Sequence, residues 1–198
     1  DFIKEPYRRK LKFMEFRLCE SLSIISDYKN KKECKERTHA YKNEQELLKD
    51  LYLIRNSLTY DKDDKLVDFG LKDLIRLVET FGFFLVNLDI REESTKHSNA
   101  INEIMNMLMK EDYLSLDEDK KVHALESLIK SEFNINSIYK KLSDETKRVV
   151  DVFLTMVKLR EQISEEAFGH YIISMTHEAS HVLEVLAIAK LTGMVKKD

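Results

Sequence analysis

Near the middle of the chain stands the run Phe83-Phe84-Leu85-Val86-Asn87-Leu88-Asp89-Ile90, followed at once by the charged run Arg91-Glu92-Glu93-Ser94-Thr95-Lys96-His97. The first run is short, nearly all apolar or β-branched, and led by Gly82, a pattern typical of a buried strand. Apolar residues with helical spacing come next, at Ile101, Ile104, Met105 and Leu108. A strand, a charged turn and a helix in this order are typical of α/β folds.

A second strand-like run lies near the C-terminus, where Tyr171-Ile172-Ile173-Ser174-Met175 follows Gly169. Two short strands cannot make a stable sheet of their own, because their edges and faces would stay unpaired. We therefore expect these two buried strands to need partner strands that the chain does not contain.

The rest of the chain is predicted to be helical, because it has one proline, four glycines and 35% charged residues that can coat amphipathic helices. Helical faces are expected over residues 7–25, 47–58, 66–80, 122–129, 149–157 and 182–188, and the polar residues 27–41 are expected to form an exposed loop. Predicted N-caps are Asn43, Ser115, Ser143 and Ser180, and predicted C-cap glycines are Gly82 and Gly193. The predicted fold is mainly α with two short strands, as one unit over residues 1–198.

Composition excludes several classes of partner. The chain has 198 residues, 33 Lys and Arg against 36 Asp and Glu, and a net charge of −3, so nucleic acid and anionic membrane are not expected to bind. Cys19 and Cys34 have no metal or CxxC spacing and are interpreted as free thiols of a cytoplasmic protein. No apolar stretch is long enough to span a bilayer. The chain begins at Asp1 without a methionine, so we expect a piece of a longer protein.

The charged run after the first strand is the strongest candidate site. Side chains at the carboxyl ends of strands point into the ligand-binding mouth of α/β folds. Arg91 could bind a phosphate or a carboxylate through its planar guanidinium. The alternative is an internal salt bridge from Arg91 to Asp89 or Glu93.

Other candidate groups are weaker. His177 and His181 have the i, i+4 spacing of zinc helices, with His170 nearby, but the glutamate of an HExxH motif is absent. His97 and His123 are expected to be solvated. Ser174 lacks a nucleophile motif, and the chain has no glycine-rich nucleotide cradle.

Two long segments resemble phosphoenolpyruvate carboxylase. Residues 73–97 are similar to that family's L-I-R-x-V-E-T-F-G-F-H-L-x-x-L-D-I-R-Q-E-S-T-x-H segment, and residues 169–190 are similar to its Y-I-I-S-M-T-x-x-x-S-D-V-L-E-V-x-L-L-x-K segment. The opening Glu5-Pro6-Tyr7-Arg8-Arg9-Lys10-Leu11 resembles the family's P-Y-R-x-x-L. The chain departs from the pattern at Phe84, where the family has histidine, and at His181, where it has aspartate.

The resemblance implies a fragment of a cytoplasmic, usually homotetrameric enzyme built on an α/β (TIM-like) barrel surrounded by many helices. That enzyme uses Mg²⁺ or Mn²⁺ to carboxylate phosphoenolpyruvate with bicarbonate, giving oxaloacetate and phosphate. By the same resemblance, Arg91 holds the substrate phosphate, while Glu93, Ser94 and His97 shape the turn after the strand. The two predicted strands would be the first two of the barrel.

The resemblance also implies what the chain lacks. The family's metal-binding glutamate and aspartate, its catalytic histidine and its H-G-R-G-G loop would lie beyond Asp198, so the chain alone is expected to bind no metal and to be inactive. A fragment with exposed barrel strands would self-associate or rearrange. The alternative function is a non-enzymatic helical interaction module.

Overall fold

A computed structural model describes residues 4–30 and 37–195 of the chain. The chain divides into two compact units, residues 1–86 and 87–198, where the sequence predicted one. No glycine- or serine-rich linker separates the two units in the sequence. That they behave together as one domain stays a prediction.

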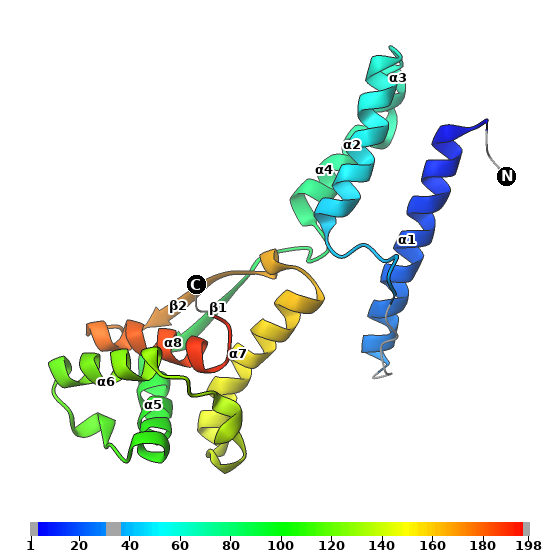
Figure 1. Ribbon diagram of the computed structural model, residues 1–198. Coiled ribbons are helices and arrows are strands. Elements are labelled where there is room, and N and C mark those ends of the chain that lie inside the picture. The colour runs from blue at the N-terminus through cyan, green and yellow to red at the C-terminus, as the bar shows by residue number, and fades with distance from the viewer. Residues whose placement is uncertain (1–3, 31–36, 196–198) are drawn as a thin grey trace. The chain divides into compact units, whose positions relative to one another are not determined.

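The first unit is helical. It contains α1 (Pro6–Lys29), α2 (Glu44–Tyr60), α3 (Asp64–Leu66), the kinked segment η1 (Val67–Leu71) and α4 (Lys72–Phe81) (Figure 1). Pro6 starts α1, where a missing N–H costs nothing. The predicted N-cap Asn43 is confirmed, since its side chain accepts the Glu46 N–H at 3.1 Å. The buried apolar side chains of this unit are Met14, Tyr41, Leu47, Leu48, Leu51, Ile54, Leu58, Val67, Ile75 and Val78.

Two predictions for this unit need correction. The exposed loop expected over residues 27–41 starts later, because α1 continues to Lys29, and its last two residues, Ala40 and Tyr41, are buried. Residues 31–36 of that prediction lie outside the described residues. The single helix expected over residues 66–80 is interrupted at Phe69 and Gly70, where Gly70 has a φ of 97° that glycine adopts without steric cost. The predicted stop at Gly82 is confirmed, with a φ of 49° at that residue.

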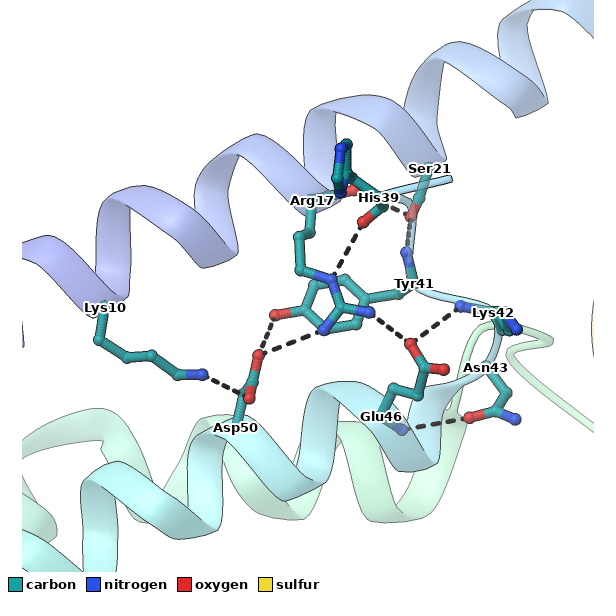
Figure 2. Close-up of polar contacts among 9 residues, drawn as sticks. All are labelled: Lys10, Arg17, Ser21, His39, Tyr41, Lys42, Asn43, Glu46 and Asp50. Atoms are coloured by element: carbon teal, nitrogen blue, oxygen red, sulfur yellow. Dashed lines mark hydrogen bonds and ion pairs between the residues drawn. The ribbon is translucent and has the colours of Figure 1, made fainter. Parts of the chain in front are cut away.

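A network of charged and aromatic side chains joins α1 to α2 (Figure 2). Asp50 accepts hydrogen bonds from Lys10 Nζ at 2.5 Å and from the Tyr41 hydroxyl at 2.8 Å. The guanidinium of Arg17 forms ion pairs with Asp50 and Glu46 and lies 3.8 Å from the centre of the Tyr41 ring. Because these charges are partly buried, mutual pairing offsets the cost of removing them from water.

The second unit places two strands against helices. Its elements are β1 (Leu88–Glu93), α5 (Ser94–Met109), η2 (Tyr113–Ser115), α6 (Glu118–Lys130), η3 (Ile135–Ser137), η4 (Tyr139–Lys141), α7 (Asp144–Gln162), η5 (Glu165–Ala167), β2 (Phe168–Ser174) and α8 (Ala179–Leu191). Helix α6 packs along α8, and α5 packs against α7 and α8. The fully buried side chains of this core include Ile101, Ile104, Met105, Tyr113, Leu125, Leu128, Phe153 and Ile188.

The two strands lie side by side and pair in parallel (Figure 1). Ile90 is opposite Tyr171, Arg91 is opposite Ile172, and Glu93 is opposite Ser174. This pairing corrects the expectation that both strands lack a partner within the chain. The first strand also starts at Leu88 rather than at Phe83, since residues 82–86 form turns and bends and Leu85 has a positive φ of 67°.

The strands are not buried as predicted. Leu88 is 52% exposed, Asp89, Arg91 and Glu93 are exposed, and no residue of β1 is fully buried. Apolar and β-branched composition predicted the strand type. Burial depends on what covers the sheet, which local sequence does not specify.

Two of the four helix ends predicted in this unit are confirmed. Ser143 caps α7, accepting the Thr146 N–H at 3.3 Å, and Gly193, with a φ of 79°, follows the end of α8. The N-cap of α6 is Asp117 instead of Ser115, because its carboxylate accepts the Lys120 N–H at 3.0 Å. Ser180 lies inside α8, which begins at Ala179.

Two further findings concern the helices and the cysteines. Among residues 4–30 and 37–195, no helix has the length and apolar content to cross a membrane. Cys19 is an exposed free thiol, and Cys34 lies outside the described residues.

Candidate functional site

Arg91 lies in the middle of β1, on the side of the sheet away from the helices. Successive side chains of a strand point to opposite faces. Ile90 and Glu92 are half-buried toward the helices, where Glu92 pairs with Lys96 of α5 at 2.7 Å. Asp89, Arg91 and Glu93 are exposed and alternate with these two residues, so they share the other face, which we call the open face.

The carboxylates beside Arg91 are engaged elsewhere. Asp89 Oδ1 accepts the backbone N–H of His170 at 2.9 Å and lies 3.5 Å from its Nδ1. The Thr95 hydroxyl donates to Glu93 at 3.1 Å. Arg91 has no hydrogen bond or ion pair within the described ranges, so neither internal salt bridge considered from the sequence is formed there. The donors of its guanidinium are therefore not used by the described residues.

Hydrogen bonds fasten the carboxyl ends of the two strands together. The Ser94 hydroxyl donates to the carbonyl of Met175 at 2.8 Å, and the Ser174 hydroxyl donates to the carbonyl of Glu92 at 3.3 Å. Met175 has a φ of 59°, an uncommon conformation for a residue with a side chain. These contacts fix the backbone just after Arg91, where residues 92–94 lie beside residues 174–175.

His97 lies beneath this strand end and is fully buried, which corrects the prediction that it is solvated. Its Nε2 is 2.8 Å from the Tyr171 hydroxyl, and the Tyr171 ring stacks on Phe153 of α7 with centroids 5.0 Å apart. Burial lowers the pKa of His97 to about 4, so the ring is neutral at pH 7. The prediction of an exposed His123 is confirmed.

Sequence reasoning missed a buried carboxylate network behind the site. Glu184 of α8 is 1% exposed and accepts hydrogen bonds from the Ser98 hydroxyl at 2.9 Å and the Tyr113 hydroxyl at 2.7 Å. Burial raises the pKa of Glu184, against the opposing effect of those two donors. Glu118 accepts from both the backbone N–H and the hydroxyl of Ser180 at 2.8 Å. A single acidic residue within the apolar stretch of α8 was the available signal.

The histidines near β2 do not form a metal centre. His177 donates its backbone N–H to His181 Nδ1 at 3.3 Å, and His170 points toward Asp89. No group of three or more His, Cys, Asp or Glu side chains is placed to hold a metal ion in residues 4–30 and 37–195. The described residues therefore do not fit a divalent metal site.

A separate cavity of about 570 Å³ lies between α5 and the start of α7. Glu92, Lys96 and Arg148 line it, together with Glu103, which accepts from the Ser143 hydroxyl at 2.6 Å. Arg91 is not one of its lining residues, since it belongs to the open face.

Comparison with known proteins gives one consistent result. The family model described as phosphoenolpyruvate carboxylase matches residues 1–198. The chain is 36% identical over 214 residues to a phosphoenolpyruvate carboxylase of Prochlorococcus marinus subsp. pastoris, covering 96% of the chain and 20% of that relative. It is 35% identical over 190 residues to one of Nostoc sp., covering 94% of the chain and 18% of the relative. The chain thus spans about a fifth of the length of the curated relatives it matches.

Proposed function

Because the chain belongs to the phosphoenolpyruvate carboxylase family, we propose that it works as part of a longer protein that carboxylates phosphoenolpyruvate with bicarbonate. The products are oxaloacetate and phosphate. The match over the whole chain favours this enzyme over a non-enzymatic helical interaction module. The isolated segment is proposed to be inactive.

The observation that carries the proposal is the unpaired guanidinium of Arg91 on the open face. Its five N–H donors form a planar fork that matches the oxygens of a phosphate group. We assign Arg91 to binding the phosphate of phosphoenolpyruvate. There it would hold the phosphorus for attack by bicarbonate and stabilise the charge on the phosphate oxygens. Attack forms carboxyphosphate and the enolate of pyruvate; carbon dioxide released from carboxyphosphate then adds to the enolate carbon.

The sheet supports the proposed barrel. Parallel strands joined by helices are the unit from which an α/β barrel is built, and a parallel sheet is normally covered on both faces. In β1 the residues of the open face are exposed, and on the other face Tyr171 of β2 stacks on Phe153 of α7. We therefore propose that β1 and β2 are the first two strands of a barrel whose interior is the open face.

The other implied features follow the same proposal. Mg²⁺ or Mn²⁺ would be bound by residues of the longer protein outside the described ones, which do not fit the ion. The protein is proposed to be a cytoplasmic homotetramer. Its near balance of acidic and basic residues supports a small-molecule enzyme rather than a nucleic-acid or membrane binder.

The direct test is an assay of the full-length purified protein for bicarbonate-dependent conversion of phosphoenolpyruvate. We expect oxaloacetate and inorganic phosphate to form in equal amounts. Phosphate release that is independent of bicarbonate, with no oxaloacetate, would reject the proposal.

A further inference from the structure

Arg91 and Asp89 are close enough to form an ion pair. They are two residues apart on the same face of β1, which separates their Cα atoms by about 7 Å along the strand. An arginine side chain spans that gap easily, and its planar guanidinium matches the two oxygens of a carboxylate. The carboxylate of Asp89 nevertheless lies on β2.

A fixed donor holds Asp89 there. The backbone N–H of His170 points at Oδ1 from 2.9 Å, and this hydrogen bond is the main cause that keeps the pKa of Asp89 below its ordinary value. The charge of Arg91 makes a smaller contribution in the same direction, although the two side chains form no ion pair. The imidazole of His170 lies 3.5 Å from the same oxygen. Because the ring is 88% exposed, we attribute the anchoring to the backbone donor, whose direction the strand fixes.

Gly169 provides the space that this contact needs. A Cβ atom at position 169 would lie 2.7 Å from Asp89 Oδ1, closer than two such atoms can approach, and 3.7 Å from the Cβ of Asn87. Gly169 does not have a positive φ, so the backbone itself does not require glycine. The observable consequence of the missing side chain is the close approach of Asp89 to the backbone of β2.

We propose that Gly169 is a positioning residue that lets Asp89 dock on β2 and so keeps Asp89 from pairing with Arg91. The guanidinium then meets an incoming dianionic phosphate without first having to release a carboxylate. The identity of that ligand rests on the proposed function. The docking of Asp89 does not depend on it.

The test uses the full-length protein with the substitution Gly169→Ala. The added methyl group displaces the flexible carboxylate of Asp89 from the His170 N–H. In a crystal structure of this variant, we expect an Asp89 oxygen within about 4 Å of a guanidinium nitrogen of Arg91. An Asp89 carboxylate that stays on β2, or one that moves away from both groups, would overturn the inference.

Steady-state kinetics of Gly169→Ala provide a second test. The KM for phosphoenolpyruvate should rise about fivefold to tenfold, with kcat within about twofold, because a competing ion pair must be broken on binding. Asp89→Asn keeps the oxygen that accepts the His170 N–H but removes the charge. It should therefore leave KM near the wild-type value and cancel the effect of Gly169→Ala in the double variant. An equal rise in KM with and without Asp89→Asn would show a backbone effect instead.

The crystal structure and the kinetics together distinguish the positioning role of Gly169 from the proposed function of Arg91. If Asp89 pairs with Arg91 in the crystal structure and KM does not change, the positioning role stands and the phosphate-binding role of Arg91 is rejected. If the wild-type protein does not turn over phosphoenolpyruvate, the crystal structure of Gly169→Ala still decides the position of Asp89.

Discussion

The Nε2 atom of His97 lies 2.8 Å from the hydroxyl oxygen of Tyr171, joining the helix after the first strand to the middle of the second. Both side chains pack in the second unit, and their rings meet edge to face with centroids 5.7 Å apart. Arg91 lies on the opposite face of the same two strands. The contact between His97 and Tyr171 thus anchors the sheet to the core, and this sheet carries Arg91, the candidate phosphate-binding residue.

Tyr171→Phe should weaken this anchor. It leaves a buried ring nitrogen of His97 without its partner, which costs about 1–2 kcal/mol, or about 5- to 30-fold in local opening. Hydrogen exchange of the β2 amides in the full-length protein measures the opening. Tyr139→Phe is the matched control, because its hydroxyl donates to Asp151 at an exposed position. Equal exchange rates in the two variants would show that the buried contact contributes nothing.

The neutral buried state of His97 predicts a pH dependence. Its pKa is about 4 in the folded protein, below the value of about 6.5 for an unfolded chain. The unfolded state therefore binds more protons between these values, so the stabilising effect is complete above pH 6.5 and is lost as the pH falls toward 4. Between pH 7 and pH 5 the loss is about 2 kcal/mol.

Urea denaturation of the full-length protein at both pH values checks this expectation. His97→Gln should remove that part of the pH dependence, while the carboxylates continue to titrate in both proteins. The assignment to His97 fails if the substituted protein loses as much stability between pH 7 and pH 5 as the wild type.

We expect Glu184 to tolerate replacement by glutamine but not truncation of its side chain to alanine. Glu184→Gln keeps an oxygen for the Tyr113 hydroxyl and removes a charge whose burial is unfavourable, so we expect stability within about 1 kcal/mol of the wild type at pH 7. Glu184→Ala opens a cavity and leaves that hydroxyl unpaired, at a cost of about 2–4 kcal/mol. Hydrogen exchange of α8 distinguishes the two variants. A Gln variant as unstable as the Ala variant would show that the charge itself is required.

Asp50 should be the most sensitive position of the network between α1 and α2. Asp50→Ala leaves Lys10, Arg17 and Tyr41 without a shared acceptor, which costs about 2 kcal/mol and makes local opening about 30-fold more frequent. Native-state proteolysis of the first unit reports that opening. Asp68→Ala is the control, since its carboxylate pairs with Lys72 at an exposed position and should contribute under 1 kcal/mol. Similar cleavage rates in both variants would contradict the cooperative network.

Local patterns predicted element types better than their limits and burial. Asn43 and Ser143 were identified as caps because a cap acts on a backbone N–H three residues away. The prediction that Ser115 caps α6 was wrong, because the carboxylate of Asp117 lies nearby and accepts the backbone N–H instead. His97 was assigned to solvent, since its burial depends on Tyr171, which is 74 residues further along the chain. The free guanidinium of Arg91 likewise depends on Gly169 and His170, whose approach to Asp89 follows from strand pairing and not from sequence neighbours.

Arg91 is proposed to bind the phosphate of phosphoenolpyruvate, and steady-state kinetics of the full-length protein with Arg91→Ala test this role most directly. We expect kcat/KM to fall about 100- to 1,000-fold, with Arg91→Lys recovering only part of the loss because an ammonium lacks the planar fork. Hydrogen exchange of β1 and β2 should match the wild type, since Arg91 makes no hydrogen bond or ion pair to the described residues. A folded Arg91→Ala protein with an unchanged kcat/KM would contradict the claim.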